Sequence, residues 1–175
     1  GMAAAELLCG RGNPSGKLSD TFADKLENYP STYNFHESEE YVDYTEDIYV
    51  GYRYFETIPG AHNHVVYPFG YGMSYTSFSW SVVSAALHNE TVQVSVAATN
   101  TGQTEGKEVI QLYFGAPQGL LGKPSKSLAA FQKTRLLKPG ESQLVILEFR
   151  VNDMASYDDL GKVEKSAYVL EAGDY

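Results

Sequence analysis

The most constraining feature of this sequence is a strict two-residue alternation of apolar and polar side chains that begins at Ser77. Because successive side chains of a β-strand point to opposite faces, such a run predicts a strand with one buried face. Turn-forming residues at 100–102, 139–140 and 172–174 separate the runs. Several short strands without helices between them predict a mainly β fold, an antiparallel β-sandwich over residues 77–175. The apolar positions of the runs are Phe78, Trp80 and Val82; Val92, Val94 and Val96; Ile110, Leu112 and Phe114; and Val145, Leu147, Phe149 and Val151.

The residues before this region have a different character. Residues 2–9 are rich in Ala and Leu and predict one short helix, stopped by Gly10 and Gly12, and residues 18–22 predict one short strand. A single helix and strand cannot build a core, so residues 1–28 are interpreted as the trailing end of a preceding α/β domain. Residues 29–76 hold most of the 14 tyrosines and show no sustained period, which indicates an extended linker.

Composition excludes several classes of protein. A formal net charge of −9, with 13 basic against 22 acidic residues, argues against nucleic acid and anionic membrane surfaces as partners. There is no run of roughly 18 apolar residues, so no ordinary transmembrane helix is expected. The single cysteine, Cys9, cannot form an internal disulfide. A cytoplasmic and a secreted location both stay open.

Four stretches, in the same order, resemble the C-terminal part of glycoside hydrolase family 3 enzymes. Residues 13–18 with Thr21 and Phe22 resemble the end of the second domain of the catalytic region. Residues 48–55 and 68–78 resemble the linker that leaves that domain. Residues 100–102, 106–113 and 137–142 resemble the fibronectin type III-like module that follows. The resemblance covers nearly the whole chain.

The resemblance implies a β-glucosidase-like or β-xylosidase-like parent that retains configuration, with a nucleophile and an acid/base carboxyl about 5 Å apart. In the family both carboxyls lie in upstream parts that this sequence does not match, so it implies no catalytic residue and no cofactor here. The expected role is an accessory module whose partners are the catalytic domains of the same parent. The family module usually continues beyond the position of Tyr175, so the sandwich is expected to lack its final strand, which leaves an edge open to dimerisation.

Two other functions compete with the accessory role. Exposed aromatic rings stack on sugar faces, so the tyrosines could make a carbohydrate-binding module for an oligo- or polysaccharide. Packing between domains explains the same tyrosines, because Tyr combines a large ring with a polar tip. A cell-surface adhesion module is the third reading, since fold alone does not fix function. The candidate sugar or interface contacts are Tyr41, Tyr44, Tyr49, Tyr52 and Tyr54.

The remaining polar clusters give weaker signals. The acidic residues between Glu37 and Asp47 match no calcium-loop spacing and are interpreted as a solvated run. His62 and His64 would lie on one side of an extended strand, but two imidazoles do not complete a zinc site, so no metal is expected. Gly70 and Gly72 precede no helix, so they predict a tight turn or a close backbone contact rather than a phosphate loop.

Overall fold

The computed structural model describes residues 1–175 and is mainly β, as the sequence predicted. It divides into two compact units, each assembled from three separate segments of the chain. Unit 1 contains residues 1–17, 72–113 and 128–154, and unit 2 contains residues 18–71, 114–127 and 155–175. The strands are β1 (Phe22–Ala23), β2 (Val65–Tyr67), β3 (Phe78–His88), β4 (Thr91–Asn100), β5 (Val109–Phe114), β6 (Ser127–Lys133), β7 (Ser142–Arg150), β8 (Ser156–Asp158) and β9 (Ala167–Val169).

The helical segments are short. They are the α-helices α1 (Met2–Leu8) and α2 (Tyr52–Thr57) and the 3₁₀ helices η1 (Leu26–Asn28), η2 (Pro30–Tyr33), η3 (Ala61–His64) and η4 (Val151–Met154). None of the helices has the length and apolar character needed to span a bilayer.

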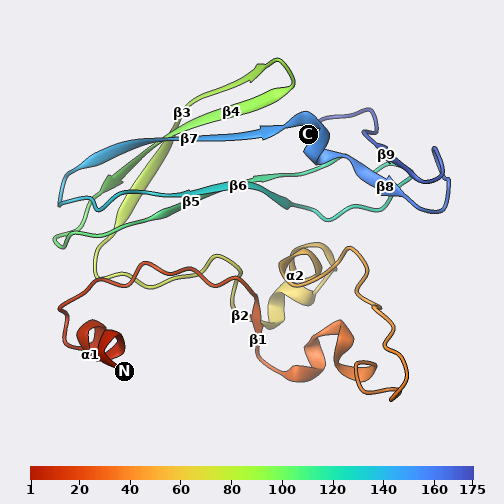
Figure 1. Cartoon of the computed structure of the whole chain (residues 1–175), viewed down its shortest axis with the longest axis horizontal. Helices are drawn as coiled ribbons and strands as arrows, with labels where there is room; N and C mark the ends of the chain where they lie inside the picture. Colours follow the sequence, from red (N-terminus) through yellow and green to blue (C-terminus); the bar gives the residue numbers. More distant parts are fainter. The chain divides into compact units, whose positions relative to one another are not determined.

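The alternating region forms an antiparallel sheet in unit 1 with the strand order β3-β4-β7 (Figure 1). β3 and β4 are joined by a two-residue turn in which Asn89 and Glu90 have φ angles of 47° and 65°. Positive φ at both central positions is typical of the type I′ turn, whose twist matches that of the flanking strands. His88 therefore lies opposite Thr91, and the hairpin places Val94 and Val96 on the same face as their partners in β7.

A second, two-stranded sheet of β5 and β6 completes the sandwich core. The apolar residues of β4 and β7 face Ile110 of β5, and Leu112 and Ala130 pack against the same cluster. Two antiparallel sheets that share one apolar interior make a β-sandwich, so the predicted fold class is confirmed. The buried cluster is Val94, Val96, Ala98, Ile110, Val145 and Leu147.

Unit 2 is built from short pieces. β1 pairs with β2, and β8 pairs with β9, each pair antiparallel. Phe55 of α2 is 2% exposed, and the Tyr29 ring meets it edge to face with centroids 5.5 Å apart. Edge-to-face contact between aromatic rings is favourable because the positive ring edge meets the negative ring face. Phe55 thus anchors α2 against Tyr29.

The structure differs from the sequence expectation in two local features. Of the strand expected over residues 18–22, only Phe22 lies in a strand, β1, which also contains Ala23. Leu18 exchanges main-chain hydrogen bonds with Gly70 and Tyr71. The linker also contains α2 and two 3₁₀ helices, η2 and η3. Helices of six residues or fewer complete less than two turns, which is too short for a periodic pattern to be visible. The helix expected over residues 2–9 is confirmed as α1.

A buried asparagine holds the end of β4. Asn100 is 0% exposed, and its Nδ2 donates to the carbonyl oxygens of Thr104 and Leu137, each at 2.8 Å. Its Oδ1 accepts from Thr76 Oγ1 at 2.6 Å and from the Gly102 N–H at 3.1 Å. Both donors and both lone pairs of the amide are therefore used, which a buried amide requires to avoid a desolvation penalty.

The glycines at the end of the linker serve close backbone packing, as the sequence predicted. Gly70 has a φ of +80°, which suits a turn. A Cβ at Gly72 would overlap the carbonyl oxygen of Gly16 and lie 2.7 Å from Lys17 Cδ. Nearby, Asn13 Oδ1 accepts hydrogen bonds from Ser74 Oγ and the Tyr75 N–H. The segment around residues 13–17 is thus fastened to the chain that enters β3, within unit 1.

Candidate functional site

The five candidate tyrosines have different environments. Tyr41 and Tyr44 are exposed, by 58% and 86%. The Tyr52 ring lies on Phe69 with centroids 4.6 Å apart, and the Tyr54 ring meets Phe55 edge to face at 5.2 Å. The Tyr49 hydroxyl lies within 3.2 Å of the position that a Cβ at Gly122 would occupy. Tyr52 and Tyr54 therefore use their rings for packing inside unit 2, and the sugar-contact role of the five residues stays a prediction.

One cleft in unit 2 is lined by aromatic and polar side chains. Its volume is about 540 Å³. Tyr54 lies on it, together with two tyrosines that were not among the candidates, Tyr29 and Tyr33. Polar groups line the same space, including Glu27 and His64. Clefts of this size with a few polar groups among aromatic rings are typical of small-ligand sites.

The acidic run and the histidine pair have local structural explanations. All acidic residues from Glu37 to Asp47 except Glu46 are exposed, in agreement with a solvated run. The expectation that His62 and His64 extend from one side of a strand is wrong, because both lie in η3. A 3₁₀ helix has three residues per turn, so residues two apart point in different directions. The structure brings no group of three His, Cys, Asp or Glu side chains together as metal ligands.

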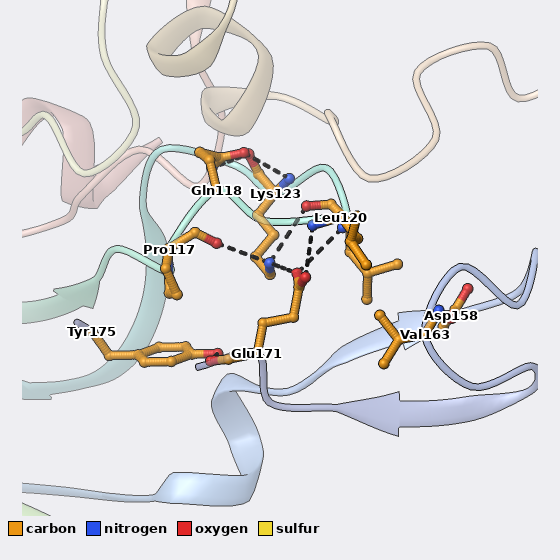
Figure 2. Close-up of polar contacts among 9 residues, drawn as sticks. Pro117, Gln118, Leu120, Lys123, Asp158, Val163, Glu171 and Tyr175 are labelled. Atoms are coloured by element: carbon orange, nitrogen blue, oxygen red, sulfur yellow. Dashed lines mark hydrogen bonds and ion pairs between the residues drawn. The ribbon is translucent and has the colours of Figure 1, made fainter. Parts of the chain in front are cut away.

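An ion pair between a buried lysine and a largely buried glutamate lies in unit 2 (Figure 2). The Lys123 ammonium, whose side chain is 2% exposed, contacts the Glu171 carboxylate and donates to the carbonyl oxygen of Pro117 at 2.8 Å. The Glu171 carboxylate also accepts the N–H groups of Leu120 and Leu121 at 2.7 and 3.2 Å. We call this arrangement, Lys123 with Glu171 and the 117–121 main chain, the 123/171 clasp. It ties the loop between β5 and β6 to the residues that follow β9.

Helix α2 is attached to the same loop. The Ser125 N–H donates to Thr57 Oγ1 at 2.8 Å, and the Ser125 hydroxyl donates to the Glu56 carbonyl oxygen at 2.9 Å. The Lys126 ammonium lies 3.0 Å from the Glu56 carboxylate. Three parts of the sequence therefore meet in unit 2: the tyrosine-rich linker, the β5–β6 loop and the residues after β9.

Asp158 organises the turn between β8 and β9. It is 0% exposed. Its Oδ1 accepts the N–H groups of Gly161 and Lys162, and its Oδ2 accepts those of Val163 and Glu164, at 2.7–3.0 Å. Burial alone would raise the pKa of Asp158, but the four N–H donors outweigh it and hold the pKa below its ordinary value of 3.8. Asp158 is thus a charged acceptor for main-chain groups.

The electrostatics of these carboxyls oppose an acid/base role. In Glu171, the hydrogen bond from Lys123 holds the pKa below its ordinary value of 4.5, against the effect of burial. A glycosidase general acid needs a raised pKa, because it must carry a proton near neutral pH. Every carboxyl with a shifted pKa here has it lowered, and these are Asp24, Glu141, Asp153, Asp158 and Glu171.

Two family models match separate parts of the chain. Residues 1–75 match the glycosyl hydrolase family 3 C-terminal domain, and residues 108–175 match a fibronectin type III-like domain. The chain belongs to glycoside hydrolase family 3. It corresponds to the C-terminal part of such enzymes, which confirms the resemblance in the sequence motifs.

Known relatives match over 88–100% of the chain. It is 59% identical over 190 residues to beta-glucosidase A from Butyrivibrio fibrisolvens, a match that covers 100% of this chain and 23% of that protein. The crystal structure of a beta-glucosidase from Paenibacillus barengoltzii superposes with a TM-score of 0.93 at 57% identity, over 98% of this chain and 19% of that one. Beta-glucosidase 3B from Thermotoga neapolitana in complex with glucose gives a TM-score of 0.81 at 46% identity, over 88% and 22%. The chain therefore spans about a fifth of the length of these family 3 relatives.

Sequence reasoning missed the residues that organise unit 2. Lys123 gave no signal, because a lysine is normally expected at the surface. Asp158 followed three residues later by Gly161 is a turn signature that could have been noticed. Tyr29 lies directly before η2, Pro30 begins this helix and Tyr33 ends it. Proline is common at the start of a helix, so Pro30 is the local sequence sign that the two tyrosines belong to one helical turn.

Proposed function

We propose that this chain is a non-catalytic accessory module of a family 3 β-glucosidase-like enzyme and that it braces the catalytic domains of its parent. The observation that carries the proposal is the state of its enclosed carboxyls. The oxygens of Asp158 and Glu171 accept main-chain N–H groups or Lys123, and their pKa values are lowered. Such groups hold a structure together and are unsuited to transferring protons to a glycosidic oxygen.

The attachment of the linker supports a bracing role. Family 3 relatives carry a long polypeptide besides the part that this chain matches, and we propose that the linker at residues 29–76 connects that part to the sandwich. Hydrogen bonds between Ser125 and α2 and the ion pair between Lys126 and Glu56 fix the linker to the β5–β6 loop. A linker fixed in this way has less freedom, so the domains that it joins keep a defined geometry.

An assay of the 175-residue chain on nitrophenyl β-glucoside and β-xyloside tests the proposal. We expect no hydrolysis, while the parent polypeptide assayed in parallel is expected to hydrolyse one or both substrates. Hydrolysis by the chain that survives purification and disappears with a carboxyl substitution such as Glu46→Gln would overturn the accessory role.

The bracing role has its own test in the parent. The Thr57→Val/Ser125→Ala variant should lose activity at a lower temperature than the natural enzyme, with an unchanged KM for an aryl glucoside at 25 °C. Ser84→Ala, at an exposed position of β3, is the control and should leave both properties unchanged. A KM change without a loss of thermal stability would contradict bracing.

A second candidate function rests on the cleft of unit 2. We propose that a mono- or oligosaccharide could occupy the space between Tyr29, Tyr33 and Tyr54, where tyrosine rings offer faces for a pyranose. Asn63 and His64 would then offer polar groups to its hydroxyls. We therefore propose this cleft, rather than the exposed Tyr41 and Tyr44, for the sugar contacts expected from the sequence.

Titration of the chain with glucose and with cello-oligosaccharides, followed by NMR or calorimetry, tests this candidate. Tyr33→Ala should weaken binding by about fivefold, because one ring stacked on a ligand is worth about 1 kcal/mol. Tyr44→Ala is a matched control, since Tyr44 is similarly exposed but lies outside the cleft lining. Binding that both variants weaken equally, or the absence of binding, would count against a saccharide site.

A further inference from the structure

An imidazole on the wall of the unit 2 cleft is held from behind by a carboxylate. His64 lines the cleft, whereas Asp24 lies outside the lining. The Asp24 carboxylate is 3.4 Å from His64 Nδ1, and the Asp24 N–H donates to the His64 carbonyl oxygen at 2.8 Å. The pairing of Ala23 with Val65 in β1 and β2 brings these two residues together. Asn28 Nδ2 donates to the same carboxylate oxygen at 2.6 Å, which fixes its position.

The contact with Asp24 decides which nitrogen of His64 is left for the cleft. Burial alone would raise the pKa of Asp24, but hydrogen bonds from Asn28 and His64 outweigh it and hold the pKa below its ordinary value of 3.8. An ionised carboxylate only accepts hydrogen bonds, so it selects the imidazole that carries its hydrogen on Nδ1. Nε2 of the neutral ring is then an acceptor for a donor group in the cleft.

The charged groups of the lining have one sign. Glu27 is the only carboxylate on it, is exposed and makes no ion pair, and the lining contains no Lys or Arg. Lys25, the neighbour of Asp24, also lies outside the lining. A ligand with a positive group therefore gains from Glu27 and from Asp24 behind His64, whereas an anionic ligand is repelled.

The tyrosines of the cleft favour the same kind of ligand. The hydroxyl of Tyr29 donates to the Thr21 carbonyl oxygen at 3.0 Å and accepts the Ala23 N–H at 2.8 Å, so its ring is held in place. Tyr33 and Tyr54 line the same space. Aromatic rings offer an apolar surface whose negative face attracts cations. The cleft thus combines surface for a carbon ring with attraction for a positive charge.

We propose that the cleft takes an amino sugar, a saccharide with a protonated amine, and that Asp24 is the positioning residue that keeps His64 as a hydrogen-bond acceptor for it. The amine lies near Glu27, and a sugar hydroxyl donates to His64 Nε2. This proposal rests on the saccharide site proposed above and adds the charge class of its ligand. Neutral sugars bind more weakly, and sugars that carry a carboxylate bind most weakly.

Titration of the 175-residue chain with glucosamine, glucose and glucuronate at low salt tests the charge class. Glucosamine should bind about fivefold tighter than glucose, as expected of one water-exposed charge pair. Glu27→Gln should remove this preference and leave glucose binding unchanged. Glu39→Gln, an exposed acidic residue outside the lining, is the matched control and should keep the preference.

The outcomes separate the two proposals. Equal binding of glucosamine and glucose would leave the saccharide site in place and overturn the charge class. Binding of none of the three sugars would overturn both. An equal loss of preference in Glu27→Gln and Glu39→Gln would assign the effect to net charge instead of the cleft, and it would also overturn the amino-sugar site.

Nitrogen NMR of the imidazoles tests the role of Asp24 without any ligand. His64 should carry its hydrogen on Nδ1 in the natural chain, and Asp24→Ala should shift it toward the tautomer with the hydrogen on Nε2. His62, in the same helix η3 but without a carboxylate contact, is the reference in each spectrum and should not change. A loss of fold would alter both histidines, whereas loss of positioning alters His64 alone. A natural chain with the His64 hydrogen on Nε2, or an unchanged His64 in Asp24→Ala, would overturn the positioning role.

Discussion

The side-chain amide of Asn100 donates a hydrogen bond to the carbonyl oxygen of Leu137 across 2.8 Å, and both residues are 0% exposed. This bond joins the end of β4 to the chain between β6 and β7. Asn100→Asp keeps the shape but replaces two donors with acceptors, so the oxygens of Thr104 and Leu137 lose their partner. We expect unfolding in urea to require about 2–4 kcal/mol less free energy.

The matched control for Asn100 is Asn152→Asp, at an exposed position of η4. A surface change of this kind should alter the free energy of unfolding by no more than about 0.5 kcal/mol. Equal effects of the two substitutions would show that the four hydrogen bonds of Asn100 contribute nothing specific.

Gly72→Ala should destabilise the fold by about 1–3 kcal/mol, because the added methyl group would overlap the Gly16 carbonyl oxygen and backbone must move to admit it. Thermal denaturation followed by circular dichroism measures the effect. Gly16→Ala is the control from the same contact, since a Cβ at Gly16 meets no atom within 4 Å. A stable Gly72→Ala variant would mean that residues 13–17 are not held against residue 72.

Glu171→Gln tests the 123/171 clasp. The substitution leaves the Lys123 ammonium buried beside neutral groups, and removing one partner of a buried pair is strongly destabilising. We expect Tm to fall by roughly 5 °C or more. Asp153→Asn removes the partner of Arg150 in an exposed pair and should change Tm by no more than about 2 °C. Equal shifts in the two variants would indicate that burial of Lys123 adds nothing to the interaction.

Acid stability should depend on Asp158. Because its folded pKa lies below 3.8, its charge contributes stability that is fully present above pH 3.8 and is lost as the pH falls through the lower folded value. Measurements of Tm between pH 7 and pH 2 should show a steep fall at the acid end. In Asp158→Asn, Tm at pH 7 should be lower and the acid fall shallower, whereas Asp159→Asn, at the exposed neighbour, should follow the natural profile. An unchanged profile for Asp158→Asn would contradict this assignment.

The sandwich could be predicted from sequence because its strands carry their own pattern. Val94 and Val96 alternate with Gln93 and Ser95, and Val145 and Leu147 recur at the same two-residue spacing. A two-residue spacing of apolar side chains is typical of a strand with one buried face. Unit 2 could not be predicted in the same way. Its elements are too short for a period, and its organising contacts join residues far apart in the sequence, such as Lys123 and Glu171. Only the three-dimensional path brings such residues together.

The sequence also does not predict whether the inward face of β3 is covered. The alternation of β3 gives Trp80 and Val82 an inward face, but the same alternation is satisfied whether that face is covered or exposed. The expectation of an absent final strand came from the family resemblance alone. It stays a prediction.

The interleaving of the two units has a consequence for recombination between family 3 enzymes. Residues 72–113 and 128–154 of unit 1 alternate along the chain with residues 114–127 and 155–175 of unit 2. A crossover at residue 108, where the match to the fibronectin type III-like domain begins, would separate β3 and β4 from β5 and β7. Chimeric enzymes that exchange only that domain would combine β3 and β4 from one enzyme with β5 and β7 from another in one core. The tyrosine-rich linker and the whole sandwich should therefore be exchanged together.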